Sequence, residues 1–470
     1  MKNRNIALTT DSYKVPQFKQ YPPNTTNVFS YFESRQEDVD ITFFGLQYII
    51  KEYLTGTVIT PEDVEEANEF IKQHIGLDNG FNYTGWMTIA TELDGKLPLE
   101  IKAVPEGTTV SGRNVLFTVE NTDPRFYWLT NYMETLLCQV WYPTTVATNS
   151  RRIRETLVEF NAETSDNDPN ETANFQCHDF GFRGVSSVET AGLGGAAHLL
   201  WFMGTDTIEA IRTLQQYYTT DNMLAWNIPA SEHSTMTSWG RENEAAAMEN
   251  MLDKFPTGMV SVVSDSYDIM NAVNNIWGDE LKEKVLNRDG RVVVRPDSGD
   301  PVVSTKKIVQ ALWDKFGGEV NEKGYKVLHP NIRMIQGDGI DLQTVREILW
   351  TFKRNGFSSE NIVFGSGGGL LQKFNRDTFK FAFKCSSIKI EGVERDVRKS
   401  PLEWNENEEY VQSNKFSKKG RLQLDFRNGN YETIDENETG VINPQLRTVF
   451  KNGELIVDES TEDVRARTIG

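Results

Sequence analysis

The middle of the chain repeats one pattern of apolar and polar positions. Four times a short apolar run ends in a cluster of Gly, Asp, Arg or Ser, and a helical pattern follows. The four runs are MVSVVSDSYD, RVVVRPDSGDP, IRMIQGDGID and NIVFGSGGG. The first three start roughly 30–40 residues apart, which is the length of one strand-and-helix unit. Because nearly continuous apolar strands are typical of a parallel sheet covered on both faces, the pattern predicts repeated βα units.

In each unit the polar cluster lies at the carboxyl end of the predicted strand. Parallel α/β folds place their ligand sites at that edge of the sheet. A single cluster is explained as well by an ordinary turn, but four clusters with residues such as Arg295, which a turn does not require, favour one shared site. The upstream segment FQCHDFGFRG has the same form. We therefore expect a barrel rather than an open sheet.

The two ends of the chain show other patterns. NVFSYFESR and LEIKAVPEGTTV alternate as strands do, and TPEDVEEANEFIKQHI carries the capping signature of a helix. Near the carboxyl end, RLQLDFRNGNYETI has two strand-like runs around Asn-Gly, which predicts a hairpin. Alternating acidic and basic clusters over residues 395–420 predict a surface loop.

Composition narrows the classes of function. The 470-residue chain has a net charge of −19, which argues against sequence-independent nucleic-acid binding because that needs a basic surface. A local group of arginines can still bind an anionic substrate. Three widely separated cysteines without a CxxC pair predict buried free thiols. No apolar run approaches the length of a membrane span and no leader pattern begins the chain, so we expect a soluble cytoplasmic protein without a membrane partner.

Three strand-end clusters suggest the binding of a sugar phosphate. In RPDSGDP, Arg295 offers a planar fork for phosphate or carboxylate, and Asp297 can accept from sugar hydroxyls or hold a hydrated metal. The glycines of GSGGG let backbone N–H groups approach an anion, with Arg376 downstream as a further charge. Asp338, between two glycines, suits a ribose. The alternatives are an Arg–Asp pair that only staples its loop, and ordinary βα turns.

Two further clusters suggest the binding of a planar heterocycle. In HDFGFRGVSS, Phe180 can stack on such a ring while Arg183, three residues on, holds an anion. Core packing is the alternative for this phenylalanine. GTDT supplies Asp206 immediately before a helical pattern, where the alternative role is a helix cap.

His233, in IPASEHSTMTSWG, is one of five histidines in the chain. A second histidine at ligand spacing is absent, which disfavours a zinc site, and no GxSxG motif accompanies it. Histidine is a usable nucleophile for phosphoryl groups. The residues alone nevertheless favour a structural histidine.

The blocks TDSYKVPQFKQYPPNT, HDFGFRGVSS, GTDT, PASEHSTMTSWG, SVVSDSYDI, RPDSG, QGDG and FGSGGGLLQK stand in this order. Together they resemble the nicotinamide phosphoribosyltransferases, a type II phosphoribosyltransferase family, over nearly the whole chain. The resemblance implies an irregular parallel α/β barrel with a second α+β domain built from the amino- and carboxyl-terminal segments. We expect an amino-terminal part over residues 1–148, the barrel with the active site over 149–384, and a returning carboxyl-terminal segment over 385–470.

The resemblance also implies an activity. The family makes nicotinamide mononucleotide and pyrophosphate from nicotinamide and phosphoribosyl pyrophosphate, which serves NAD salvage. It uses Mg²⁺, held mainly by the pyrophosphate, and ATP as a co-substrate. It works as a homodimer with its active sites at the interface.

Carried over by motif, the resemblance assigns roles to single residues. Phe180, and Tyr13 of a second subunit, resemble the two rings that enclose nicotinamide. Asp206 resembles the acceptor of its carboxamide N–H groups, with Arg295 beside the ring. His233 resembles the histidine that ATP phosphorylates, oriented by Asp265. The remaining matches are the phosphoribosyl and pyrophosphate contacts Arg183, His233, Arg295, Asp297, Gly337, Asp338, Gly367, Gly368, Arg376 and Ser261, and the cross-dimer residues Tyr13, Arg35, Lys384 and Lys415; Asp297 is also placed among the catalytic residues.

Two departures and three rivals qualify this interpretation. Asn227 stands where the resemblance leads us to expect serine, and residues 395–414 are longer and more acidic than expected. A nicotinate phosphoribosyltransferase is disfavoured by Asp206, because a carboxylate repels nicotinic acid. A catalytically silent nucleotide sensor is disfavoured because His233 and the arginines are all present. An unrelated sugar-phosphate barrel leaves the TDSYK block without a role.

Overall fold

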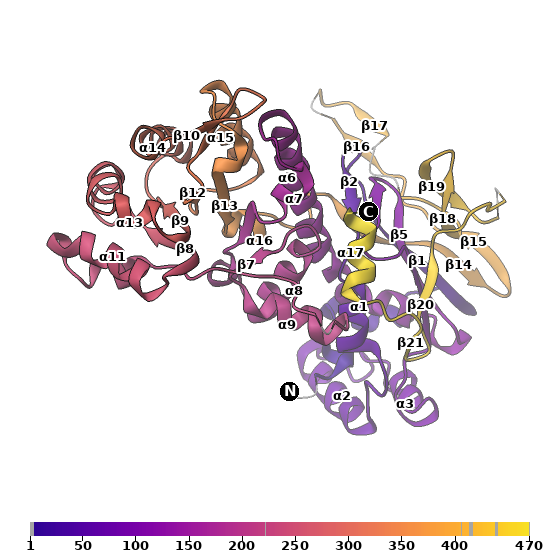
Figure 1. The fold of residues 1–470 in the computed structure, drawn as a ribbon. Helices are drawn as coiled ribbons and strands as arrows, with labels where there is room; N and C mark the ends of the chain where they lie inside the picture. Colours follow the sequence, from indigo (N-terminus) through magenta and orange to yellow (C-terminus); the bar gives the residue numbers. More distant parts are fainter. Residues whose placement is uncertain (1–3, 221, 406, 413–416, 438–439, 470) are drawn as a thin grey trace. The chain divides into compact units, whose positions relative to one another are not determined.

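The computed structural model describes residues 4–220, 222–405, 407–412, 417–437 and 440–469. The chain divides into two compact units (Figure 1). The barrel unit comprises residues 146–215 and 221–374, and the terminal unit comprises residues 1–145, 216–220 and 375–470. The sequence prediction drew the second boundary between 384 and 385. The structure moves it to 374/375, because residue 384 lies inside a strand that pairs with the amino-terminal part of the terminal unit.

The barrel unit is built on six parallel strands in the order β7-β6-β13-β12-β9-β8. Their bounds are β6 Cys177–Asp179, β7 Gly204–Thr205, β8 Thr257–Val263, β9 Asp289–Arg295, β12 Ile332–Gln336 and β13 Ile362–Ser366. Single parallel bridges join Gly204 to Trp226 and Ala230 to Ser261, so the segment between Trp226 and Ala230 links the two edge strands. The sheet therefore curls into an irregular barrel, and the predicted fold class is confirmed.

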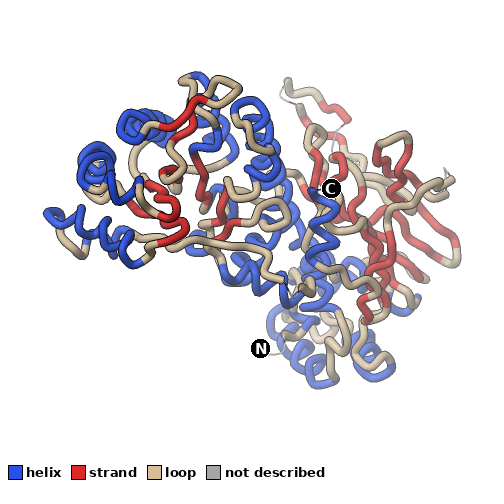
Figure 2. The backbone as a smooth tube through the Cα atoms, viewed as in Figure 1, coloured by secondary structure: helices blue, strands red, loops and turns tan. Residues whose placement is uncertain are grey.

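Helices surround these strands in the barrel unit (Figures 1 and 2). They are α6 Trp141–Thr164, α7 Pro169–Ala173, α8 Val188–His198, α9 Ile208–Tyr217, α10 His233–Thr237, α11 Glu244–Lys254, α12 Ile269–Asn271, a π-helix at Ala272–Glu280, α13 Lys282–Leu286, α14 Pro301–Phe316, α15 Leu342–Arg354 and α16 Gly368–Leu371. A short hairpin, β10 Gly318–Val320 and β11 Lys326–Leu328, follows α14.

The loops between strands and helices end in capping residues. Asp300 accepts from the backbone of Val303 at the start of α14, where Pro301 occupies the first helical position. Asp341 does the same for α15. These caps end each loop a few residues after its strand, so the residues in between are held near the carboxyl edge of the sheet.

The terminal unit contains a seven-stranded antiparallel sheet in the order β15-β14-β1-β5-β3-β20-β21. The strands are β1 Thr25–Ser34, β3 Leu99–Ala103, β5 Val115–Asn121, β14 Phe381–Ile390, β15 Val393–Asp396, β20 Arg447–Lys451 and β21 Glu454–Leu455. Its longer helices are α2 Pro61–Ile75, α3 Tyr83–Glu92 and α17 Thr461–Ile469, with short helices α1 Leu46–Ile49, α4 Leu129–Tyr132 and α5 Glu134–Leu137.

Small two-stranded sheets complete the terminal unit. They pair β2 Asp40–Thr42 with β4 Thr109–Ser111, β16 Leu402–Trp404 with β17 Tyr410–Gln412, and β18 Leu422–Arg427 with β19 Asn430–Asp435. The predicted hairpin around Asn-Gly is confirmed, with positive φ at Asn428 and Gly429. The prediction of a loop over 395–420 is wrong in part, because the Trp404 and Tyr410 rings pack against each other across a hairpin, with centroids 4.9 Å apart and planes tilted by 43°.

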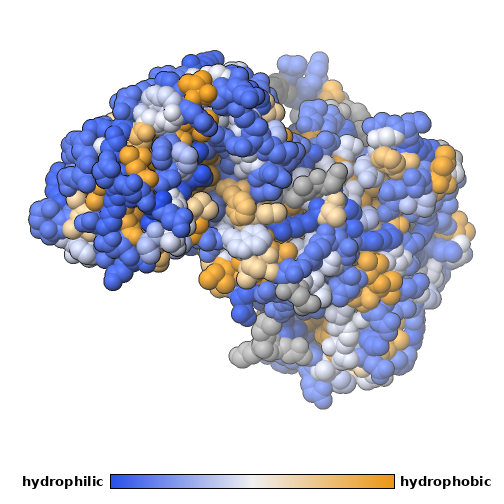
Figure 3. All heavy atoms as spheres, in the orientation of Figure 1, coloured by the Kyte–Doolittle hydropathy of each residue, from blue (hydrophilic) through white to orange (hydrophobic). Residues whose placement is uncertain are grey.

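The visible surface of both units is mostly hydrophilic, with apolar residues in small groups (Figure 3). Among the described residues, no helix is long and apolar enough to cross a membrane.

One buried carboxyl group ties several parts of the terminal unit together. Glu106 accepts from the backbone of Gly45 at 2.9 Å and of Gln47 at 2.6 Å, and from the Tyr218 hydroxyl at 2.7 Å. Burial raises the pKa of Glu106 to about 7, and these three hydrogen bonds only partly oppose the rise.

This raised pKa predicts a pH-dependent stability. The folded state binds the proton of Glu106 more tightly than the unfolded state does, so the stabilisation is complete below about pH 4.5 and is lost as the pH rises through about 7. Glu106→Gln cannot ionise. Urea denaturation should show the free energy of unfolding of the parent, relative to the variant, falling by about 3 kcal/mol across this window. The exposed Glu62→Gln on α2 is the control, and curves that stay parallel for parent and Glu106→Gln contradict the prediction.

Candidate active site

The carboxyl ends of the barrel strands surround a cavity of about 590 Å³. Phe180 follows β6, Asp206 follows β7, and the loops after β9, β12 and β13 complete the wall. The lining residues are Phe180, Phe182, Arg183, Asp206, Thr207, Arg295, Asp297, Gly337, Asp338 and Gly367. The structure thus brings together strand-end clusters that lie up to 187 positions apart in the sequence.

Arg295 and Asp297 form a two-pronged ion pair at the end of β9. The Arg295 Nε donates to Asp297 Oδ1 at 2.9 Å, and its Nη2 lies 2.9 Å from Oδ2. The same guanidinium lies 5.1 Å from the centroid of the Phe180 ring. The Arg295–Asp297 ion pair, which the sequence analysis considered as a purely structural link within the loop, is therefore present. It also holds the Arg295 guanidinium against the Phe180 ring, which lines the cavity.

Two glycines make room for these side chains. A Cβ at Gly365 would lie 2.1–2.8 Å from atoms of the Phe180 ring, and one at Gly337 would lie 2.8 Å from Asp297 Oδ1. Gly368 has no atom within 4 Å of its ideal Cβ position. The glycines in GSGGG and QGDG therefore differ. Gly365 and Gly337 leave space for the side chains of Phe180 and Asp297, whereas Gly368 faces open space.

His233 is joined to the loop after β9 through one carboxylate. Its Nε2 lies 2.9 Å from Asp265 Oδ1, while Asp265 Oδ2 accepts from the Asp297 backbone at 2.9 Å and from the Ser298 hydroxyl at 2.5 Å. Burial alone raises the pKa of Asp265, but these hydrogen bonds outweigh it and the net pKa is lowered. The carboxylate therefore stays ionised, buried at 2% exposure beside a histidine that is 46% exposed.

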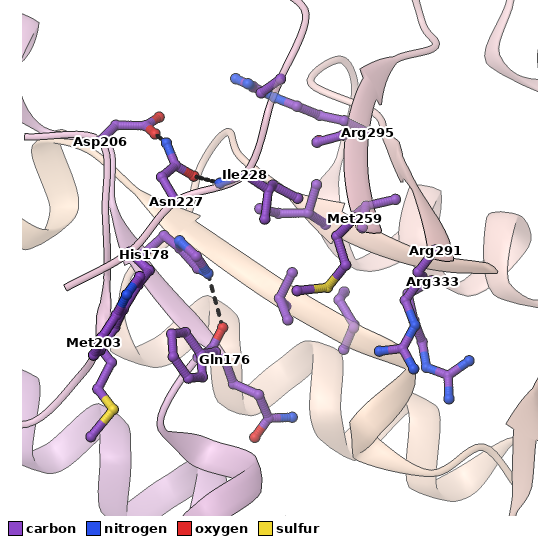
Figure 4. Close-up of a pocket in the computed structure, with 18 of the residues that line it drawn as sticks. Gln176, His178, Met203, Asp206, Asn227, Ile228, Met259, Arg291, Arg295 and Arg333 are labelled. Atoms are coloured by element: carbon purple, nitrogen blue, oxygen red, sulfur yellow. Dashed lines mark hydrogen bonds between the residues drawn. The ribbon is translucent and has the colours of Figure 1, made fainter. Parts of the chain in front are cut away.

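Asp206 has a polar neighbour that the sequence analysis did not assign to it. The Asn227 side-chain amide donates to Asp206 Oδ1, and Asn227 Oδ1 accepts from the Ile228 backbone at 2.8 Å (Figure 4). Burial raises the pKa of Asp206, opposed by the charges of Arg295 and Arg183. Asparagine at this position is thus a donor to the carboxylate, where the resemblance had led us to expect serine.

Two further residues at the end of β6 escaped the sequence analysis. Asp179 is fully buried, burial raises its pKa to about 6, and its Oδ2 has no hydrogen-bond partner among the described residues. His178 lines the barrel interior, and burial lowers its pKa to about 4. Their hydrogen bonds are local, because His178 Nε2 lies 3.0 Å from the Phe175 carbonyl oxygen and Asp179 Oδ1 accepts from the Gly181 backbone at 2.7 Å. The burial that shifts their pKa values depends on the assembled barrel, so the HDFG block alone carries no signal for it.

A second cavity, of about 830 Å³, fills the interior of the barrel (Figure 4). It shares Phe180, Asp206 and Arg295 with the smaller cavity and continues along the strands toward their amino-terminal ends. Ser261, predicted as a phosphoribosyl contact, lines this interior cavity on β8. We call the interior cavity the lumen.

The remaining predicted residues belong to the terminal unit. Tyr13 is 61% exposed, Arg35 follows β1, Lys384 lies on β14, and Arg376 is exposed beside Asp377. Lys415 lies outside the described residues. The roles of these residues stay predictions.

Comparison with known proteins bears on this arrangement. The family model described as "Nicotinate phosphoribosyltransferase (NAPRTase) family" matches residues 175–454, and the model of the amino-terminal domain of nicotinamide phosphoribosyltransferase matches residues 5–101. The chain belongs to the nicotinate phosphoribosyltransferase family. It is therefore a phosphoribosyltransferase, and the resemblance inferred from the sequence is confirmed.

Relatives of this phosphoribosyltransferase cover almost its whole length. A protein of Xanthomonas campestris named nicotinamide phosphoribosyltransferase is 46% identical, over 98% of this chain and 97% of its own. One of Acinetobacter baylyi with the same name is 34% identical over the same shares. Among solved structures, a nicotinate-nucleotide pyrophosphorylase from Pyrococcus furiosus has a TM-score of 0.59, at 15% identity over 99% of this chain and 94% of that one. Human nicotinic acid phosphoribosyltransferase has a TM-score of 0.55, at 15% identity over 98% and 92%. The two structures show the fold.

The contact between Gly365 and Phe180 makes a testable prediction. Gly365→Ala places a methyl group against the ring, so the ring or the strand must shift, at a cost of about 1–3 kcal/mol in unfolding free energy. Thermal denaturation measures the loss. Gly368→Ala, whose methyl group meets open space, is the matched control. Equal melting temperatures for the two variants would contradict the packing described here.

Proposed function

We propose that this protein is a nicotinamide phosphoribosyltransferase, which forms nicotinamide mononucleotide and pyrophosphate from nicotinamide and phosphoribosyl pyrophosphate. The observation that carries the proposal is the position of the Asp206 carboxylate in the same cavity as the Phe180 ring and the Arg295 guanidinium. An aromatic ring, a carboxylate and a cation match the three parts of the reaction: a planar base, its amide and an anionic sugar. The names of the full-length relatives support the same activity.

Asp206 would select the amide over the acid. An ionised carboxylate accepts hydrogen bonds from a carboxamide N–H₂, whereas it repels the carboxylate of nicotinic acid. The charges of Arg295 and Arg183 favour the ionised form of Asp206 against the effect of its burial. Asn227 donates a hydrogen bond to the same carboxylate. This argument favours nicotinamide over the nicotinate that the broader family name suggests.

The phosphoribosyl group would bind along the loops after β9, β12 and β13. Asp297 and Asp338 offer acceptors for ribose hydroxyls, and Arg183 and Arg295 offer donors for pyrophosphate. The backbone N–H groups of Gly367 and Gly368 would bind the 5′-phosphate. Arg376, a few residues later in the sequence, would add a positive charge. The described residues hold no group of three or more His, Cys, Asp or Glu fit to bind a metal. On the family resemblance, we assign Mg²⁺ mainly to the pyrophosphate, where it would reduce the charge on the leaving group.

The bond exchange takes place at C1′ of the ribose. The ring nitrogen of nicotinamide gives its electron pair to C1′, while the C1′–O bond breaks and its electron pair leaves with pyrophosphate. The centre between the two is an oxocarbenium-like carbon. Arg183 and Arg295 stabilise the charge that grows on the leaving oxygen, and Phe180 holds the base in line.

His233 would couple the reaction to ATP. With its Nε2–H directed at Asp265, the lone pair lies on Nδ1, which can attack the terminal phosphorus of ATP as ADP departs with the electrons of the broken P–O bond. Water later removes the phosphoryl group, so one ATP is hydrolysed per cycle. Asp265 stabilises the positive charge of the phosphorylated ring.

The terminal unit would act in a homodimer. Tyr13, with its exposed ring, would cover nicotinamide bound to the partner subunit, and Arg35, Lys384 and Lys415 would reach its phosphates. The product is a precursor of NAD, so this dimeric enzyme would serve NAD salvage.

The first test compares nicotinamide with nicotinate as substrates. The parent, supplied with phosphoribosyl pyrophosphate and Mg²⁺, should form mononucleotide from nicotinamide and prefer it over nicotinate in kcat/KM. Asp206→Asn removes the charge, so the preference should shift toward nicotinate by at least about tenfold, or 1.4 kcal/mol. In the parent, the preference should also weaken as the pH falls toward the raised pKa of Asp206.

Asp253→Asn, which removes an exposed carboxylate of α11, serves as the control. No product from nicotinamide would overturn the proposed activity, and an unchanged preference in Asp206→Asn would remove this carboxylate from the selection.

The second test isolates the histidine. His233→Ala should abolish ATP hydrolysis and ATP stimulation but retain measurable transferase activity, because the phosphoribosyl contacts remain. ADP release and mononucleotide formation are measured side by side. His74→Ala on α2 is the control variant. ATP stimulation that survives in His233→Ala returns this residue to a structural role.

A further inference from the structure

The lumen has two chemically different ends because its walls are strands. Arg291, Val293 and Arg295 on β9 all line it, as do Arg333 and Ile335 on β12. Alternate residues of a strand face the same way, and four residues span about 13 Å. Arg295 therefore marks the end described above, beside Phe180, and Arg291 marks an inner end at the start of the strands.

Two arginines converge at the inner end. Arg291 and Arg333 extend side by side, with their guanidinium groups neighbouring each other (Figure 4). Arg291 donates through Nε to the Pro330 carbonyl at 2.7 Å. Arg333 donates through Nη1 to the carbonyls of Leu328, His329 and Ile332 at 2.8–2.9 Å. Each guanidinium thus anchors to the backbone through one nitrogen, which leaves other N–H groups directed at the lumen.

The charge at the inner end is not balanced. Burial, and then the charge of Arg291, lower the pKa of Arg333 to about 10, so both guanidinium groups stay protonated at neutral pH. Glu360 also lines the lumen, where its carboxylate accepts from the Asn167 side chain at 2.7 Å and from the Ser165 hydroxyl. Its charge raises the pKa of both arginines, so one carboxylate lies near two guanidinium groups. Among the described residues, neither arginine forms an ion pair with a carboxylate. Two partly buried guanidinium groups beside a single carboxylate leave a net positive charge, which favours an anionic ligand.

The walls beside the arginines are apolar. Met259, Val293, Ile335 and Ile362 come from four neighbouring strands. The Phe175 and Trp226 rings, 6.1 Å apart, add aromatic surface. A ligand that fits both features carries one negative group on an apolar, planar body.

We propose that the inner end of the lumen is a binding subsite for a small aromatic monocarboxylate, with its carboxylate on Arg291 and Arg333 and its ring against Met259, Val293 and Ile335. The subsite is distinct from the phosphoribosyl site, because it lies at the opposite ends of the same strands. Asp206, at the other end of the lumen, repels the same molecules. Aromatic acids should therefore bind at the inner end rather than beside Asp206. Neutral amides carry no charge, so this difference between the two ends does not apply to them.

Calorimetric titration of the full-length protein with benzoate, benzamide and acetate tests this proposal. Benzoate should bind at least about tenfold more tightly than benzamide, because only the carboxylate makes charge-assisted bonds to the guanidinium groups. It should also bind more tightly than acetate, which lacks the ring. Equal affinities for benzoate and benzamide overturn the charge assignment, and equal affinities for benzoate and acetate overturn the apolar wall.

Variants of Arg291 locate the binding. Arg333 is unsuitable because its guanidinium holds three backbone carbonyls. Arg291→Gln should weaken benzoate about tenfold and leave benzamide unchanged, and Arg291→Lys should recover most of the affinity. The matched control is Arg288→Gln, which removes an arginine that also bonds backbone carbonyls but does not line the lumen. Benzoate binding that is unchanged in Arg291→Gln overturns the proposal.

These titrations are independent of turnover. Failure of the parent to convert nicotinamide leaves the benzoate titration intact, so the loss of the proposed activity and the loss of this subsite are distinguishable. Conversely, Arg291→Gln should keep the nicotinamide kcat of the parent, because Arg291 lies outside the residues assigned to the reaction.

Discussion

Parallel pairing along β9 decides where the side chains of both ends of the lumen lie. This strand pairs with β8 on one side, which places Arg295 beside Val263, and with β12 on the other, which places Val294 beside Met334. Arg295, at the carboxyl end of the strand, therefore lies in the candidate active site. Arg291, four positions earlier, lies at the inner end of the lumen. A slip of one residue would turn Arg291 and Arg295 to the outer face of the sheet. One register therefore supports both the candidate active site and the proposed subsite.

Much of this arrangement is readable from the sequence, because it depends on local pattern. Apolar runs predicted five of the six barrel strands, and the clusters that follow them predicted most of the cavity lining. Arg295 and Asp297 were predicted to share a loop, and they pair at 2.9 Å. The edge strand β7 has only two residues, Gly204–Thr205, which is too short to form an apolar run of its own.

What the sequence did not reveal depends on contacts between distant segments. Asn227 donates to a carboxylate 21 positions away, and the guanidinium groups of Arg291 and Arg333 meet only because their strands are neighbours. The buried Asp179 looks like any strand-end aspartate until the helices cover it. The prediction of a loop over 395–420 was wrong in part because charged residues conceal the alternation of Leu402 and Trp404 in a short exposed hairpin.

Asp265 divides its two oxygens between two parts of the barrel unit. One accepts from His233 on α10, and the other holds the loop that carries Asp297 and Ser298. A carboxylate shared in this way passes a change of charge at the imidazole directly to that loop. Thermodynamic linkage makes the effect mutual. If His233 is phosphorylated as proposed, any gain in the affinity of this loop for its ligand that the phosphoryl group causes is matched by an equal stabilisation of the phosphohistidine when the ligand is bound.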